Sequence, residues 1–143
     1  MTYPDLQQRL SALVAFQCAL VGLRGVDPEA SEEMLWQTLL ADLIEHYGFR
    51  RVWYCQCVDH GLRPVVSVPT ITSDLEELPR EIEESSPLLA TADLALPISI
   101  EGCIEGRLLV YSTGGVATDQ AEQIRILAEE AATMLAERRF RFD

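Results

Sequence analysis

The chain has 143 residues, 48% of them hydrophobic and 24% charged, which is the composition of one globular domain and not of a disordered segment. Its formal net charge of −12 at pH 7 repels phosphate backbones and anionic lipid, so nucleic acid and membrane surfaces are disfavoured as partners. The most apolar run, residues 12–23, is shorter than the roughly 18 residues that a bilayer-spanning helix needs. Because the first residues also lack a basic secretory signal, we expect a cytoplasmic protein whose cysteines stay reduced.

The N-terminal segment, residues 5–24, is predicted to form a helix. Pro4 and Asp5 suit its first turn, because proline is tolerated there and an acid matches the positive end of the helix dipole. Leucines recur at three- and four-residue spacing and make one apolar stripe. We expect this helix to end at Gly22 and Gly25.

Residues 34–59 form the centre of the predicted domain. A wide-faced amphipathic helix ends at Gly48, the residue type favoured where a helix closes in the left-handed conformation. The apolar strand 51–58 follows, and a turn leads to the returning strand 62–68, so the two form a hairpin. Pro64 lacks an amide donor, which predicts a sheet edge or a bulge at that point.

The second half of the chain begins with an acidic segment, residues 70–87, which prolines interrupt. It is predicted to be a loop with short helical turns over one face of the sheet. Two strands, 92–99 and 103–112, form a second hairpin, and Gly106 predicts a bulge or a close backbone approach. The last helix, residues 119–141, carries an apolar stripe close to heptad spacing.

Three segments, in this order and spacing, resemble those of the GAF domain family. EHYGFRRVWYCQCVD (45–59) is similar to the family's helix end, glycine, apolar strand and acidic turn. ADLALPISIEGCIEGRLLVYS (92–112) resembles its proline-containing hairpin, and DQAEQIRILAEEAATMLAERR (119–139) its closing helix. The resemblance covers about residues 5–140. It implies an α+β fold, in which a central antiparallel sheet of about five or six strands has the N- and C-terminal helices on one face and a short variable helix and loop segment on the other.

The resemblance further implies that residues 1–143 are a single, non-catalytic sensory or regulatory domain of a bacterial signalling protein. Typical hosts are histidine kinases, cyclic-di-GMP enzymes and transcriptional regulators. A small molecule would bind between the sheet and the variable segment, and the signal would pass through dimerised terminal helices to an output domain. The expected homodimer interface combines the stripes of helices 5–24 and 119–141: Leu6, Leu10, Leu13, Ile124, Leu127, Ala131, Met134 and Leu135.

The chain departs from two ligand-binding branches of the family. It lacks the Asn-Lys-Phe-Asp-Glu signature of cyclic-nucleotide-binding members, and none of its cysteines lies in a context like the bilin-attaching motif of phytochromes. The ligand and any cofactor are therefore left unnamed. A ligand-free dimerisation or protein-interaction module is the alternative interpretation.

The expected ligand site lies on one face of strand 51–58, because side chains alternate between the two faces of a strand. Trp53, Cys55 and Cys57 share a face, and we expect them to line the pocket together with Tyr111. Both faces of the strand are apolar, and a one-residue error reverses the assignment. The face that carries Tyr54 remains the alternative.

No catalytic or metal site is predicted. Cys55 and Cys57 lack the further ligands that zinc needs and are interpreted as small buried hydrophobic residues. His46 and His60 are interpreted as structural. An enzyme alternative, free methionine sulfoxide reductase, also has a GAF fold, but it needs nucleophilic and resolving cysteines in its middle loops, and residues 68–89 contain none.

Overall fold

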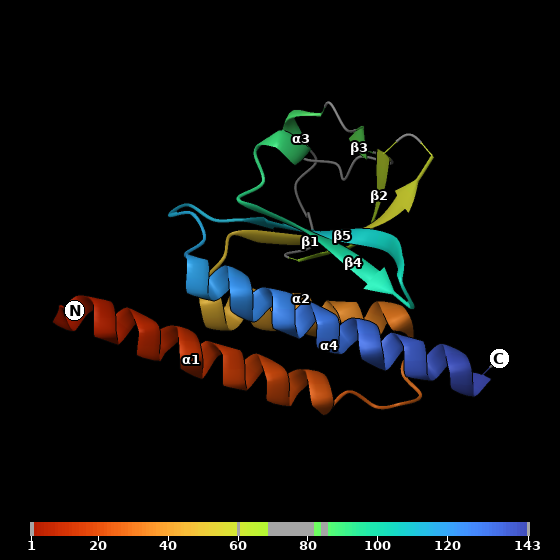
Figure 1. The fold of residues 1–143 in the computed structure, drawn as a ribbon, viewed down its shortest axis with the longest axis horizontal. Helices are drawn as coiled ribbons and strands as arrows, with labels where there is room; N and C mark the ends of the chain where they lie inside the picture. Colours follow the sequence, from red (N-terminus) through yellow and green to blue (C-terminus); the bar gives the residue numbers. More distant parts are fainter. Residues whose placement is uncertain (1, 60, 69–81, 84–85, 143) are drawn as a thin grey trace.

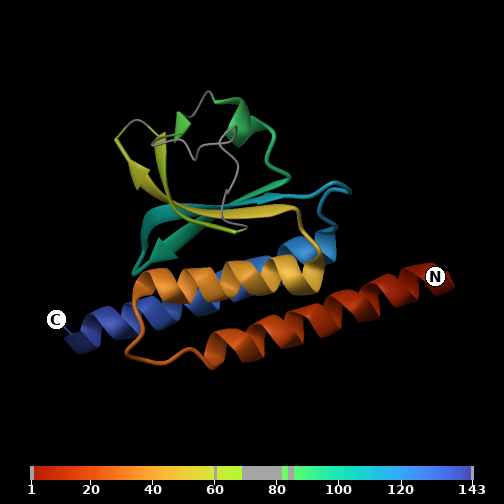
Figure 2. The same cartoon turned by 180° about the vertical axis from the view of Figure 1, so that it is seen from behind.

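The computed structural model describes residues 2–59, 61–68, 82–83 and 86–142, which form an α+β fold (Figure 1). In chain order the elements are α1 (Tyr3–Arg24), α2 (Glu32–Tyr47), β1 (Arg51–Val58), β2 (Gly61–Val68), β3 (Ile82–Glu83), α3 (Pro87–Ala90), β4 (Leu94–Ile100), β5 (Cys103–Tyr111) and α4 (Thr118–Phe142). Within the described residues the sheet is antiparallel, in the order β3-β2-β1-β5-β4. Helices α2 and α4 lie side by side under one face of this sheet, α1 lies outside them, and α3 lies on the opposite side (Figures 1 and 2). The predicted fold class is confirmed.

Strand β1 is central, since it pairs with both β2 and β5. Its register with β2 shifts between Tyr54, which faces Val66, and Cys55, which faces Pro64. Val65 is therefore an extra residue, and the bulge predicted at Pro64 lies at this point. Most of the acidic segment predicted to be a loop, residues 69–81 and 84–85, lies outside the described residues.

Two glycines lie where the sequence predicted that the backbone needs a residue without a side chain. Gly48 closes α2 with a φ of 75°, in the left-handed region that favours glycine. At Gly106 of β5, a Cβ atom would overlap the carbonyl oxygen of Cys55 and press against the Tyr54 ring. The predicted close approach at Gly106 is therefore present.

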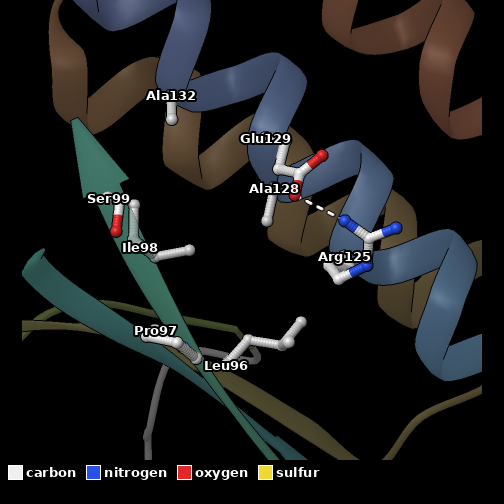
Figure 3. Close-up of a pocket in the computed structure, with 8 residues that line it drawn as sticks. All are labelled: Leu96, Pro97, Ile98, Ser99, Arg125, Ala128, Glu129 and Ala132. Atoms are coloured by element: carbon white, nitrogen blue, oxygen red, sulfur yellow. Dashed lines mark hydrogen bonds and ion pairs between the residues drawn. The ribbon is translucent and has the colours of Figure 1, made fainter. Parts of the chain in front are cut away.

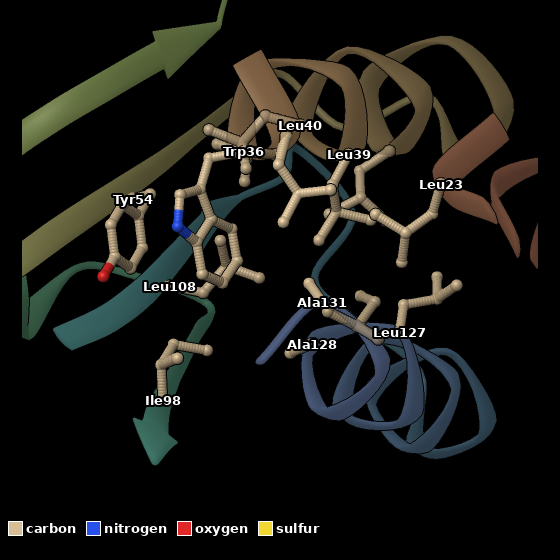
Figure 4. Packing of buried hydrophobic residues seen from close by; sticks show 14 of the residues in the cluster. Leu23, Trp36, Leu39, Leu40, Tyr54, Ile98, Leu108, Leu127, Ala128 and Ala131 are labelled. Carbon is tan, nitrogen blue, oxygen red and sulfur yellow. The ribbon is translucent and has the colours of Figure 1, made fainter. Parts of the chain in front are cut away.

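The main core lies between the sheet and the α2–α4 pair (Figure 4). Trp36 of α2 stacks on Tyr54 of β1 with ring centroids 4.1 Å apart. Around this pair pack buried side chains of α2, α4 and the sheet: Leu39, Leu40, Leu43, Val52, Ile98, Leu108, Leu127, Ala128 and Ala131. Leu23, near the end of α1, reaches into the same core.

The α4 half of the expected dimer interface needs correction. Ile124, Leu127, Ala131 and Leu135 are fully buried in the chain's own core, and Met134 packs against that core. The four fully buried side chains leave no surface for a partner in this fold, and Met134 is only partly buried. Helix α4 covers the sheet and a neighbouring helix at the same time, and this requires a wide apolar face. Such a face also places apolar residues at heptad-like spacing.

Helix α1 packs on α2 and α4 through small residues, and the predicted leucine stripe faces outward. The inward face holds Ala12, Ala15, Ala19 and Leu23. The helix begins with a capping box between Thr2 and Asp5, which the sequence analysis missed. It does not end at Gly22; instead, the missing side chain at Gly22 makes room for the carboxylate of Asp42 on α2.

By length and composition α1 is able to cross a bilayer, which the shorter apolar run in the sequence did not indicate. A core helix passes the same test, so this single helix is weak evidence for a membrane span.

Candidate ligand site on the sheet

A second, smaller cluster lies on the face of the sheet away from α2 and α4. Its buried members come from three strands and from the short β3: Trp53, Cys55, Leu62, Leu109 and Ile82. Leu88, Leu89, Ala92 and Tyr111 pack against them. Trp53 and Cys55 thus lie on this second face, whereas Tyr54 lies on the helix-covered face.

Aromatic and cationic groups surround the Trp53 indole. The Tyr111 ring meets it edge-on, with centroids 5.6 Å apart and planes at 61°. The Arg51 guanidinium carbon lies 5.2 Å from the indole centroid and 5.9 Å from that of Tyr111. The Tyr111 hydroxyl donates a hydrogen bond to the Leu88 carbonyl, which ties β5 to α3. Burial raises the pKa of Tyr111 to about 12, so its hydroxyl remains a donor at neutral pH.

The indole Nε1 of Trp53 is the unusual feature of this cluster. Trp53 is only 1% exposed, and its N–H finds no acceptor in the part of the chain that the structure describes. Leaving a buried donor unsatisfied costs about 1–3 kcal/mol, so most buried donors are paired. The sheet therefore presents a desolvated donor inside an apolar, aromatic environment, which suits a ligand atom with a free lone pair.

The structure brings three of the four expected pocket residues together. Trp53, Cys55 and Tyr111 share the second cluster, but Cys57 is exposed and lies outside it. Burial, and secondarily the nearby Cys57, raises the pKa of the Cys55 thiol to about 12. Because the thiolate is the nucleophile and the metal ligand, Cys55 is unreactive in this environment.

A second hollow lies between the edge strand β4 and α4 (Figure 3). Its volume is about 250 Å³, and Leu96 and Ile98 face Ala128 across it. The polar groups at its rim are already engaged, since Arg125 pairs with Glu129 and with Glu122. None of the buried unpaired polar atoms among the described residues lies in this hollow, so it is the weaker candidate site.

A third cluster lies on α2, where Asp42, Glu45 and His46 hold potential ligand atoms within 4.8 Å of one another. The His46 Nε2 lies 3.8 Å from Asp42 Oδ1, one helical turn away. Asp42 Oδ2 is buried against Gly22 with no partner among the described residues. Burial raises the pKa of Asp42, and His46 opposes this rise. The sequence analysis did not single out Asp42, because its burial depends on how α1 crosses α2.

Comparisons with solved structures agree with this architecture. The chain is similar to the GAF domain of a phosphoenolpyruvate-protein phosphotransferase from Coxiella burnetii, with a TM-score of 0.68 and 11% identity over 92% of this chain and 96% of that one. It is also similar to the GAF domain of a putative sensor histidine kinase from Pseudomonas syringae pv. tomato, with a TM-score of 0.60 and 17% identity over 96% and 95% of the two chains. A third similar structure is the nlh2 GAF domain of A. aeolicus in an inactive state, with a TM-score of 0.55 and 10% identity over 94% and 99%.

No sequence family matches the chain, and no curated protein matches it. The structural matches nevertheless cover almost the whole of both chains. The chain therefore has the GAF fold.

Proposed function

We propose that this chain is a non-catalytic sensory or regulatory module that holds a small molecule against the Trp53 face of its sheet. The observation that carries the proposal is the buried, unpaired Trp53 Nε1. Supporting it, the cluster around the indole is apolar and aromatic, with the Tyr111 ring edge-on to Trp53, which is the environment that a flat ligand would enter if the packing opened. The unpaired N–H would orient the ligand, because a hydrogen-bond acceptor of the ligand at this point removes a desolvation cost that the free protein bears.

The chemistry of the site favours binding over catalysis. Cys55 is its one thiol within the described residues, and the raised pKa of Cys55 keeps it protonated. A reductase of the methionine sulfoxide type needs an ionised cysteine and a resolving partner. The side chains in the described part of the cluster thus supply shape, one donor and a nearby cation, which are the requirements of recognition.

Transmission, in this proposal, runs through a homodimer to an output domain in the cytoplasm. The outer face of α1 supports dimerisation, because it carries the expected interface residues Leu6, Leu10 and Leu13 in exposed positions. Helix α1 contacts α4 through the ion pair between Arg24 and Glu130, whose Nε and Oε1 atoms lie 3.2 Å apart. A change at the sheet would reach α1 through the α2–α4 layer between them.

Native mass spectrometry of the purified protein tests the ligand. We expect a small molecule to co-purify with the wild type and to be lost from Trp53→Phe. Trp36→Phe is the matched control, since Trp36 is also 1% exposed but lies on the helix-covered face. Both variants remove similar volume from a core, so equal loss of the bound mass from both would overturn the assignment to Trp53.

The exposed apolar face of α1 also favours a second candidate, a dimerisation module that binds no ligand. It predicts the same dimer with no bound mass in any preparation. A dimer of wild-type protein that stays free of small molecules when purified from several hosts would support this alternative.

A further inference from the structure

Residues 86–92, which contain α3, form a short strap that packs on the second cluster. The strap lies on the side of the sheet away from α2 and α4 (Figures 1 and 2). Leu88, Leu89 and Ala92 contact the cluster, yet all three are only partly buried, and α3 has no fully buried residue. An element with so little buried surface opens at a low cost in free energy.

The strap is fixed at both ends by backbone hydrogen bonds. At its start the Ser86 amide donates to the Glu83 carbonyl oxygen of β3, with 2.9 Å between the two atoms. Just after its end the Asp93 amide donates to the Val110 carbonyl oxygen at 2.9 Å, and the Ser112 amide donates to the Asp93 carboxylate at 2.7 Å. The residues between these points are therefore able to move away from the sheet while both ends stay attached.

In the middle of the strap, one backbone carbonyl is bound from the sheet. Three other carbonyl oxygens accept hydrogen bonds from amides of the strap itself, namely those of Ser86, Pro87 and Leu89. The Leu88 carbonyl oxygen instead accepts from the Tyr111 hydroxyl of β5. The Tyr111 ring also meets Trp53 edge-on, so this hydrogen bond ties the strap down beside the indole.

Movement of the strap would change the hydrogen-bonding groups around Trp53. Because Trp53 is only 1% exposed, a ligand reaches its N–H only after the packing around it opens. Opening at the strap breaks the bond between Tyr111 and Leu88, which leaves one more donor and one acceptor beside the unpaired indole N–H. Each of these groups costs free energy unless the ligand binds it. A ligand that binds all three offsets the cost of opening.

We propose that the Tyr111–Leu88 hydrogen bond is a latch, which a ligand breaks and replaces with its own hydrogen bonds. This inference rests on the proposed function and specifies its ligand. The ligand accepts from Trp53 Nε1 and from the Tyr111 hydroxyl, and it donates to the Leu88 carbonyl oxygen. Its class is a flat, neutral molecule with an acceptor and a donor on one edge, as in a cyclic amide. A charged ligand is disfavoured, because it would lose its hydration in an apolar cluster.

Acrylamide quenching of Trp53 fluorescence tests the latch without any ligand. Trp36→Phe leaves Trp53 as the one tryptophan of the chain, and Tyr111→Phe is made in that background. We expect Tyr111→Phe to raise the quenching constant about fivefold, the change in open population that corresponds to one ordinary hydrogen bond. Tyr47→Phe is the matched control, because the Tyr47 hydroxyl also donates one hydrogen bond, to Gln123 Oε1 at 2.8 Å, but on the helix-covered side of the sheet. Equal quenching constants in the two variants would overturn the latch.

Hydrogen exchange measured by mass spectrometry supplies a second test in which Trp36 stays in place. We expect the amides of residues 86–92 to exchange several-fold faster in Tyr111→Phe than in the wild type, while those of α2 keep their rates. Faster exchange by the same factor throughout the chain would show a loss of global stability instead of a local opening, and would contradict the latch.

Two flat compounds of similar size, 2-quinolinone and quinoline, test the ligand class. Both carry a hydrogen-bond acceptor, but only 2-quinolinone has an N–H donor beside it. We expect calorimetric titration of the wild type at neutral pH to show about tenfold tighter binding of 2-quinolinone, because it alone pairs the Leu88 carbonyl. Trp53→Phe should weaken both compounds. Equal affinities, or no measurable binding of either compound, would overturn the ligand class.

These results separate the latch from the proposed function on which it rests. A small molecule that co-purifies with the wild type, although Tyr111→Phe changes neither quenching nor exchange, would overturn the latch and keep the function. Faster quenching and exchange in Tyr111→Phe, in a protein that binds no small molecule, would keep the local opening and overturn both the ligand class and the function.

Discussion

Two buried polar atoms, Trp53 Nε1 and Asp42 Oδ2, lack partners among the described residues, and their settings give them different roles. Trp53 lies inside an apolar cluster, where a ligand acceptor would satisfy it. Asp42 lies in the α1–α2 seam, where Gly22 gives it just enough room. In the proposed function the first atom would contact the ligand, whereas the second marks a local cost in helix packing.

That cost makes stability depend on pH. Burial raises the pKa of Asp42 above its ordinary value, with His46 opposing the rise. A raised folded-state pKa means that the contribution of Asp42 is complete below the unfolded pKa and is lost as the pH rises through the folded one. We expect Asp42→Asn, which does not ionise, to increase the free energy of unfolding at neutral pH, because no charge is then buried, and to flatten its dependence on mildly acidic pH.

Urea denaturation at acidic and neutral pH measures both effects. Glu33→Gln is the control, because Glu33 is exposed on the same helix and lies outside the cluster of Asp42, Glu45 and His46. A destabilised Asp42→Asn protein at neutral pH would show that the His46 interaction outweighs burial.

Thiol labelling tests the placement of β1 directly. Cys18, Cys57 and Cys103 are exposed, whereas Cys55 is buried and its pKa is raised to about 12. We expect iodoacetamide to label those three thiols in the native protein and Cys55 only after denaturation. Rapid labelling of Cys55 in the native protein would contradict its burial in the second cluster.

At the scale of elements, the sequence predicted where helices and strands lie, but for a segment with two candidate inward faces it did not predict which face is buried. Strand β1 was identified from its composition, but which face carries the ligand site depends on packing partners. For α1 the leucine stripe stood out, yet the structure buries the alanine face, because small side chains let the helix lie close to α2 and α4. The unpaired Trp53 donor was not predictable, since it depends on the positions of acceptors distant in sequence.

The end of α4 offers a test with two adjacent arginines. Arg138 is 7% exposed and donates to the carbonyl oxygens of Ala30 and Asp27, which anchors the α1–α2 connection. Arg139 pairs with Glu32 and Glu105, but its side chain is 37% exposed. We expect Arg138→Met to cost about 2–3 kcal/mol of unfolding free energy, because it leaves carbonyls unpaired. Arg139→Met should cost at most about 1 kcal/mol, because exposed ion pairs are screened.

Guanidinium would screen the ion pairs, so urea is the appropriate denaturant for this comparison. The reverse order of the two costs would show that the Glu32–Arg139–Glu105 bridge, and not the buried guanidinium, holds the end of α4.

At the scale of the whole molecule, charge and apolar surface are separated. The acidic charge lies outside α1, and α1 presents the uncovered apolar face. We expect the proposed dimer to tighten as the ionic strength rises, because the Debye length falls from about 30 Å at 0.01 M to about 8 Å at 0.15 M salt and repulsion between the acidic bodies is screened. Sedimentation equilibrium across this range measures the trend, and dissociation with added salt would indicate an interface held by ion pairs.

Thermal unfolding in the presence of small molecules tests the central claim most directly. The panel consists of flat, largely apolar compounds that each carry a hydrogen-bond acceptor. A compound at about a hundred times its Kd stabilises the folded protein by about 2.7 kcal/mol. We predict at least one compound that raises the Tm of the wild type and of Trp36→Phe but not of Trp53→Phe. A compound that stabilises Trp53→Phe as strongly as the wild type would place binding elsewhere and contradict the account.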